Sequence, residues 1–225
     1  MDAALLQQKI YGGYAKAAVR IGPTYSLYRP PAGVATNPIV SGNLITTLPA
    51  SFNAEDMKYQ KPNKYGKATW YCIADGTQMQ VGDYLVGQSG TFFIAGMQET
   101  LPILAVECNR QVRIGRMPAE SGAGLKPYSG KVQSEEVDAL GTTGPEGSFE
   151  SGWPASILLG GRSDGGTTLP SGVKMSGVLI LLPASVPIEI VESDVIQDNL
   201  GRDYAIYTAE LSDLGWRIQA NEEHS

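Results

Sequence analysis

The N-terminal positions carry apolar residues at helical spacing. One apolar face over residues 2–20 is made by Leu6, Ile10, Tyr14, Ala17 and Ile21. Asp2 can cap this helix, and Gly22-Pro23 would end it. Gly12-Gly13 costs about 1 kcal/mol per residue relative to alanine. The helix therefore needs a surface to lie on, which is either its own domain or a neighbouring subunit.

Further along the chain, short apolar runs separated by glycine turns replace the helical period. Strand-length runs cover 68–74, 84–86, 91–95 and 101–108, and a second set follows over 177–220. Gln88-Ser89-Gly90 has the composition of a hairpin turn. This pattern predicts a mainly β fold, a small β-barrel or sandwich, whose core is formed by residues 65–116 and 177–225.

The two strand sets contain a weak internal repeat. At a constant offset of 111 residues, Asp83 aligns with Asp194, Leu85 with Ile196, Gly90 with Gly201 and Phe93 with Tyr204. Each copy consists of an aspartate, an apolar strand, a glycine turn and an aromatic strand, and the aspartates suit turn capping. The chain contains either two related β-units or two hairpins that share only the common hairpin pattern.

Two regions lack strand periodicity. Residues 23–64, after a short strand at Tyr25–Tyr28, are rich in proline and predict an extended arm. Residues 117–176 form a Gly/Ser-rich loop insertion in which only Trp153–Leu159 resembles a strand. The GGRSDGG segment lacks the lysine and hydroxyl residue of a P-loop, so no phosphate site is predicted.

Composition restricts the possible chemistry. The chain has 225 residues and a net charge of −6, which argues against a surface that binds nucleic acid through phosphate contacts. The one histidine, His224, lies next to the C-terminus, which disfavours triad catalysis. Cys72 and Cys108 lie in apolar runs and favour buried free thiols over a bridge. No catalytic residue, metal site, cofactor, signal peptide or membrane helix is predicted.

Two other classes of protein stay open. A β-rich hydrolase would need two carboxylates across a cleft, and pairs such as Glu135-Glu136 are present. A receptor- or carbohydrate-binding tail module could use aromatic residues such as Tyr65, Trp70 and Tyr71. Buried or interface positions are the more usual place for such aromatic residues.

The stretch GDYLVGQSGTFFIAGMQETLPILAVECNRQVRI resembles the small β-barrel proteins of tailed-bacteriophage necks, of the head-closure, stopper and collar type. The opening LLQQKIYGGYAKAAVRIG followed by TYSLYRP also resembles virion-gene products of such phages. This resemblance implies a non-enzymatic virion protein at the head–tail junction, assembled in the host cytoplasm. Its partners would be copies of itself in a ring, the portal or adaptor, and the tail terminator or tube. DNA would pass through the lumen without sequence-specific contact.

Contacts between subunits are expected from residues 2–20, 29–50 and 117–176. Because aromatic and arginine side chains dominate interface energies, six residues in or near these segments are the predicted anchors: Tyr14, Tyr28, Arg29, Leu125, Tyr128 and Trp153.

Overall fold

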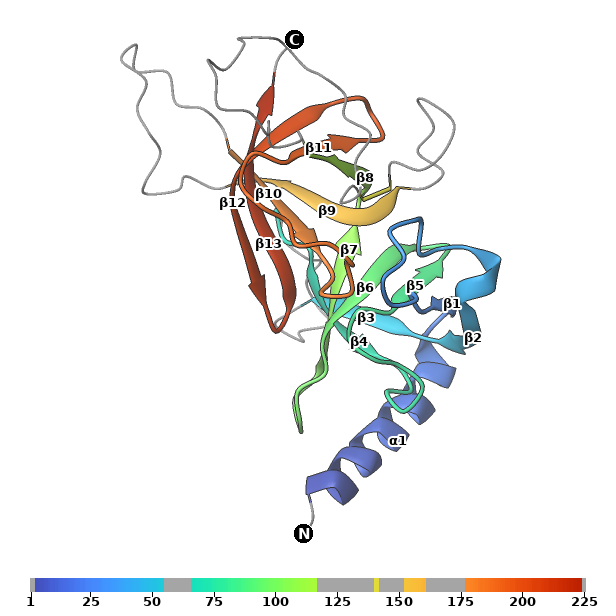
Figure 1. Cartoon of the computed structure of the whole chain (residues 1–225). Coiled ribbons are helices and arrows are strands. Elements are labelled where there is room, and N and C mark those ends of the chain that lie inside the picture. Colours follow the sequence, from blue (N-terminus) through green and yellow to red (C-terminus); the bar gives the residue numbers. More distant parts are fainter. Residues whose placement is uncertain (1–2, 55–65, 117–139, 142–151, 161–176, 224–225) are drawn as a thin grey trace, which may run out of the picture.

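The computed structural model describes residues 3–54, 66–116, 140–141, 152–160 and 177–223 (Figure 1). Helix α1 (Ala3–Ile21) comes first, and strands make up most of the described chain after it. The predicted class, mainly β with an N-terminal helix, is confirmed. The strands build two successive β-units, named here the first unit (Thr24–Cys108) and the second unit (Arg110–Glu223).

The first unit is a seven-stranded antiparallel sheet in the order β2-β1-β5-β6-β7-β4-β3. Its strands are β1 (Thr24–Tyr28), β2 (Leu44–Pro49), β3 (Ser51–Ala54), β4 (Thr69–Ile73), β5 (Tyr84–Gly87), β6 (Gly90–Gly96) and β7 (Ile103–Cys108), and a 3₁₀ turn, Ser41–Asn43, precedes β2. The outermost strands, β2 and β3, follow each other in the chain with only Ala50 between them. The two edges of the sheet therefore meet, and the sheet curls back on itself.

The second unit is a closed barrel in the order β10-β13-β12-β11-β8-β9. Its strands are β8 (Arg110–Gly115), β9 (Trp153–Leu159), β10 (Gly177–Leu182), β11 (Val195–Asp198), β12 (Asp203–Ser212) and β13 (Gly215–Glu223). Strand β7 passes into β8 through Asn109 alone, so the second unit begins where the first ends.

The two units have the same strand order and the same register. The order β1-β5-β6-β7-β4-β3 corresponds to β8-β11-β12-β13-β10-β9. Leu27 pairs with Leu85 as Ile114 pairs with Ile196. A register shift follows Ile94 in β6 and Ile206 in β12, at corresponding positions. These correspondences indicate that one β-unit is repeated in tandem.

The buried core repeats residue by residue. All twelve buried residues of the first unit's interior have a counterpart that is buried in the second. The pairs are Tyr25/Val112, Leu27/Ile114, Leu48/Trp153, Ala50/Ala155, Cys72/Ile180, Ala74/Leu182, Met79/Ile190, Leu85/Ile196, Phe92/Tyr204, Ile94/Ile206, Ile103/Ile218 and Ala105/Ala220. Apolar character is shared at every pair, whereas the residue type usually changes.

The predicted repeat is correct before the hairpin turn and wrong by one residue after it. Asp83/Asp194 and Leu85/Ile196 occupy corresponding positions. Beyond the turn, the counterpart of Tyr204 is Phe92 rather than Phe93. The chain from Ile196 to its partner Tyr204 is one residue longer than the chain from Leu85 to its partner Phe92, and Gly201 belongs to this longer turn.

The predicted arm and shared core differ from the observed arrangement. Within residues 23–64, strands β1, β2 and β3 belong to the first unit, because the prolines cluster in the β1–β2 loop and at the end of β2. Within residues 117–176, β9 closes the barrel between β8 and β10. The remainder of the predicted insertion, apart from Leu140, Gly141, Gly152 and Gly160, lies outside the described residues. Residues 65–116 and 177–225 contribute to two cores rather than to one.

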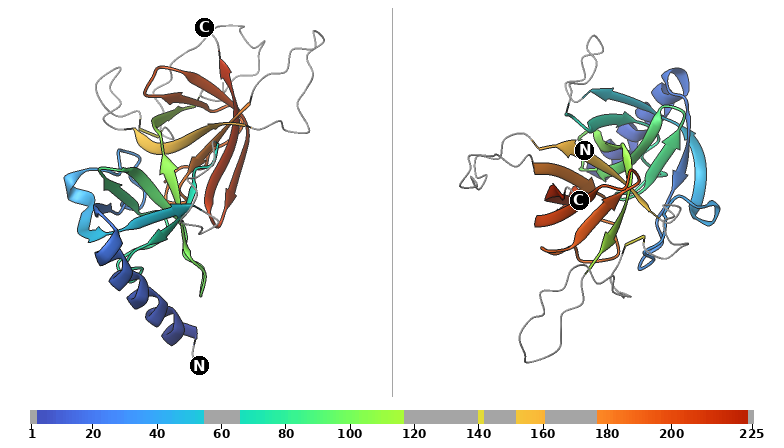
Figure 2. Two further views of the ribbon diagram at one scale, coloured as in Figure 1. Left: turned by 180° about the vertical axis from the view of Figure 1, so that it is seen from behind. Right: turned by 90° about the horizontal axis from the view of Figure 1, so that it is seen from above.

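The units are joined by a buried contact around Tyr84. Its hydroxyl donates a hydrogen bond of 3.0 Å to the Pro154 carbonyl oxygen. Its ring meets that of Trp153 edge to face, with centroids 6.4 Å apart. Residues from the outer face of β5, β6 and β7 share one hydrophobic cluster with the second unit. The two units therefore pack as one body, with α1 extending to one side (Figures 1 and 2).

Removing the Tyr84 hydroxyl should lower the stability of the fold. Because Tyr84 is wholly buried, Tyr84→Phe leaves the Pro154 oxygen without its donor, and we expect unfolding free energy to fall by about 1–2 kcal/mol. Urea unfolding followed by circular dichroism measures the change. Tyr207→Phe, at a 39% exposed position in β12, is the matched control and should change stability by less than about 0.5 kcal/mol.

Candidate functional site

Helix α1 is seated on one end of the first unit, formed by the β4–β5 and β6–β7 loops. Tyr11 covers Gly76, where an added Cβ would lie 2.6 Å from the tyrosine ring. The Thr100 backbone N–H donates a 2.6 Å hydrogen bond to the Gln7 side-chain oxygen. Tyr14 also packs on the core of the first unit, and this burial raises its pKa. We call this contact the helix seat.

Gly22 sets the angle at which α1 enters the sheet. Its N–H donates to the Ala18 carbonyl oxygen at 2.8 Å, which closes the last turn of the helix. A Cβ at this position would lie 2.5 Å from the Ala50 carbonyl oxygen, so only glycine fits between the helix and the β2–β3 junction. The end of α1 is therefore fixed to the first unit.

The opposite face of α1 points away from the body, and the N-terminal turns extend beyond the sheet (Figures 1 and 2). Leu5 is 47% exposed and Val19 is 72% exposed. Lys9 and Lys16 lie between them on the same stripe, since these positions recur at helical spacing. The helix contains three basic residues and no acidic residue. This outward face is apolar and cationic, which is the composition of a contact surface for an acidic partner.

Each unit also contains a buried aspartate clasped by an arginine. Arg29 donates to both Asp83 carboxylate oxygens at 2.9 and 2.7 Å, and Arg116 does the same to Asp194 at 2.7 and 2.9 Å. The carboxylates also accept the backbone N–H of Gln80 and Val191, respectively, as turn capping predicts. The bond to Asp83 raises the pKa of Arg29. These clasps hold the loop that enters β5 and β11, so they are structural.

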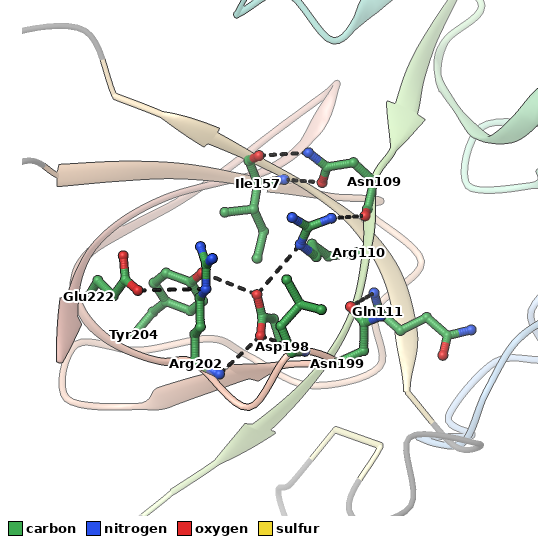
Figure 3. Close-up of polar contacts among 10 residues, drawn as sticks. Asn109, Arg110, Gln111, Ile157, Asp198, Asn199, Arg202, Tyr204 and Glu222 are labelled. Carbon is green, nitrogen blue, oxygen red and sulfur yellow. Dashed lines mark hydrogen bonds and ion pairs between the residues drawn. The ribbon is translucent and has the colours of Figure 1, made fainter. Parts of the chain in front are cut away.

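A polar cluster lies at the other end of the second barrel, around the buried carboxylate of Asp198 (Figure 3). This carboxylate accepts hydrogen bonds from the Leu200 and Arg202 backbone N–H groups and from the Tyr204 hydroxyl. The Arg110 guanidinium lies 3.6 Å away. Burial, followed by the nearby Asp198 charge, raises the pKa of Tyr204.

This cluster stabilises the β11–β12 turn and the end of the barrel, and it does not have the arrangement of a catalytic centre. The oxygens of Asp198 are occupied by donors, so this carboxylate is not placed to accept a proton from a bound molecule. Asn109 adds a bridge, since its side chain exchanges two hydrogen bonds with the Ile157 backbone (Figure 3). The corresponding end of the first unit is aromatic, and Phe52 stacks on Phe92 with centroids 3.7 Å apart.

The two cysteines are free, as predicted. Burial raises the pKa of Cys72 to about 12, so its thiol stays protonated near neutral pH. In a Cys108→Ser background, we expect Cys72 to react with a thiol reagent at pH 8 at least about a hundredfold faster after unfolding in guanidinium than in the native state. Similar rates in both conditions would contradict this burial.

The predicted anchor residues are dispersed. Tyr14 lies in the helix seat, Tyr28 packs beside the cluster shared by the units, and Arg29 clasps Asp83. Trp153 is predicted as an interface anchor, but it is wholly buried in its own chain. Its indole N–H donates to the Ala35 oxygen at 3.1 Å. Leu125 and Tyr128 lie outside the described residues.

Sequence reasoning missed the helix seat and the two arginine partners. The position of the arginines in the sequence could have indicated them. Arg29 directly follows β1, which pairs with β5, and Arg116 directly follows β8, which pairs with β11. The aspartates directly precede β5 and β11. No sequence pattern indicates the helix seat, because it depends on the contact of Gly76 with Tyr11, which is far away in the sequence.

No family model, curated protein or solved structure matches the chain. Among the described residues, no helix is long and apolar enough to cross a membrane. In the same part of the chain, no group of three or more histidine, cysteine, aspartate or glutamate side chains is arranged to hold a metal ion.

Proposed function

We propose that the chain is a non-catalytic structural subunit of a tailed-phage virion at the head–tail junction. It would form a collar, head-closure or neck ring that links portal or adaptor to tail and surrounds the DNA passage. The observation that carries this proposal is the outward face of α1, whose Leu5 and Val19 are exposed on a helix anchored at its other face. A helix held rigidly and pointed outward is suited to contact a neighbouring subunit.

Two further features support the proposal. The neck-like stretch corresponds to β5, β6, β7 and β8, which lie at the junction of the two units. The net charge of −6 would disfavour tight adhesion of DNA within a passage. The paired units give each subunit a rigid wall of two joined β-barrel-like bodies.

Electron microscopy of virions that carry a tagged copy of the chain tests this assignment. Label at the junction between head and tail is the expected result. Label on tail fibres, or a chain that is absent from purified virions, would contradict the proposal. Binding of the purified chain to the portal or adaptor of the same virion gives an independent measurement.

A receptor- or carbohydrate-binding tail module is the alternative. Phe52 and Trp70 are partly exposed aromatic residues at one end of the first unit. Their rings are already engaged, since Phe52 stacks on Phe92 and the Trp70 indole N–H donates to Glu107 at 2.9 Å. Glycan-array binding that is lost in Trp70→Ala would favour this alternative.

A further inference from the structure

An open pocket of about 580 Å³ lies on the second unit. The β10–β11 loop and the β12–β13 hairpin supply its apolar lining, which includes Ala184, Val186, Ile190, Ala209, Leu211 and Trp216. Leu211 is 56% exposed although it lies among these apolar side chains. The lining therefore presents apolar surface to solvent, which is costly unless another body covers it.

The pocket is the second unit's counterpart of the helix seat. The residue numbers of Gly76 and Ala184 differ by the same amount as those of corresponding residues in the preceding strands β4 and β10, such as Cys72 and Ile180. The β12–β13 hairpin likewise corresponds to the β6–β7 loop that contains Thr100. Gly76 is buried beneath Tyr11, whereas Ala184 is exposed. The first unit therefore covers this end with α1, and no described helix covers it in the second unit.

One lining residue, Trp216, also carries an unpaired polar group. The Trp216 indole nitrogen is buried, in a side chain that is 6% exposed, and has no hydrogen-bond partner among the described residues. A buried N–H without an acceptor costs about 1–3 kcal/mol.

Charge identifies the occupant. Glu189 lines the pocket, and the two loops that form it, residues 183–194 and 213–214, contain Glu189, Glu192, Asp194 and Asp213 but no basic residue. Asp194 is paired with Arg116, whose guanidinium also donates to the Glu189 carbonyl oxygen, so Glu189, Glu192 and Asp213 are the remaining acidic groups of the loops. The outward face of α1 has the opposite character, with Lys9 and Lys16 between exposed Leu5 and Val19. Apolar lining with an acidic rim is complementary to an apolar stripe with lysines.

We propose that this pocket receives the outward face of α1 from a second copy of the chain. Leu5 enters the apolar lining, and Lys9 and Lys16 meet Glu189 and Glu192. Each helix then lies between the first unit of its own chain and the second unit of the next. The contact is head-to-tail, so repetition closes a ring or extends a filament. This inference rests on the homo-oligomer part of the proposed function, and it names the surfaces involved.

Exchanging the charges across the contact tests the proposal. The helix variant combines Lys9→Glu with Lys16→Glu, and the pocket variant combines Glu189→Lys with Glu192→Lys. Either variant alone places like charges together, so we expect its self-association, measured by analytical ultracentrifugation, to weaken by about tenfold or more. An equimolar mixture places opposite charges together and should associate again. The exchange Glu210→Lys with Arg217→Glu, on the outer face of the same hairpin, is the matched control and should behave as wild type.

Cross-linking gives a second measurement at the same contact. Leu5→Cys with Leu211→Cys should form disulfides between chains under oxidation, whereas Leu5→Cys with Leu159→Cys should not. Leu159 is 78% exposed and lies near the start of β10, at the opposite end of that strand from the pocket. Both variants are made in a Cys108→Ser background, because Cys108 is only half-buried, whereas the native Cys72 is buried and should not interfere.

The outcomes separate this inference from the broader proposal. A wild-type chain that stays monomeric overturns both the contact and the ring. Wild-type self-association that neither variant weakens, a mixture that does not recover, or a Leu5→Cys to Leu211→Cys disulfide within one chain overturns the contact alone. The position of label in the virion tests the neck assignment separately.

Discussion

Replacing Trp153 with alanine should lower the free energy of unfolding by about 4 kcal/mol, because the change deletes the largest fully buried side chain of the described residues. The indole fills the interior of the second unit and reaches both units. Its N–H bonds to Ala35 in the β1–β2 loop, and its ring meets Tyr84. Trp153→Ala therefore creates a cavity and removes one of the two donors to the Ala35 oxygen, which still accepts the Gly141 backbone N–H. Urea unfolding measures the loss.

Two comparisons show what the loss means. Leu159→Ala, in the same strand but 78% exposed, should change stability by less than about 0.5 kcal/mol. Trp153→Phe keeps most of the volume and should retain part of the stability. If Trp153→Ala were stable as a monomer and changed only self-association, the residue would be an interface anchor after all, and its buried position would be wrong.

The sequence contained the repeat, but no single offset could recover it. The shift between corresponding residues rises from 87 at β1, from Leu27 to Ile114, to 115 at β7, from Ala105 to Ala220. Each loop differs in length between the units, so a constant offset matches only one strand at a time. The identical triplets Pro49-Ala50-Ser51 and Pro154-Ala155-Ser156 mark the same bend in both units. Three residues are too short a match to stand out without the pairing.

Most helix and strand positions were predictable because they follow from local periodicity, whereas β2, β3 and the contacts that join the elements were not. The face predicted from spacing contains Tyr14, but Leu6 and Ile21 at its two ends are exposed. The helix is seated instead through Gln7, Tyr11 and Tyr14, because Gly76 leaves room beneath Tyr11. Burial of Trp153 could not be distinguished from exposure, because an aromatic residue suits a core and an interface equally. Pro49 suggested an arm, yet a proline at the end of a strand is compatible with a sheet.

Repetition explains the common scaffold, and the differences between the units mark where new roles arise. The core pairs keep their apolar character, and both Arg–Asp clasps keep their geometry. The ends diverge, since one unit has the helix seat and the other has the pocket. The unequal ends are what two copies would need to fit head to tail.

Breaking either clasp should be costly. Asp194→Asn keeps the shape of the side chain but removes the charge that faces Arg116, and it turns an amide NH₂ toward guanidinium donors. Because Asp194 is 1% exposed and Arg116 is 25% exposed, we expect a loss of about 2–3 kcal/mol. Asp83→Asn should cost about as much, since its clasp has two equivalent arginine bonds and an equivalent backbone donor, Gln80 in place of Val191. Guanidinium unfolding of both variants gives the comparison.

The exposed pair between Glu210 and Arg217 is the matched control. Its atoms are 4.0 Å apart and its side chains are 62% and 58% exposed, so Glu210→Gln should cost less than about 0.5 kcal/mol. Equal losses in Glu210→Gln and Asp194→Asn would mean that the clasps contribute no more than surface charge. A large loss in only one of Asp83→Asn and Asp194→Asn would mean that the two units, despite equal geometry, depend on their clasps to different degrees. Equal large losses would show that each unit requires its own clasp.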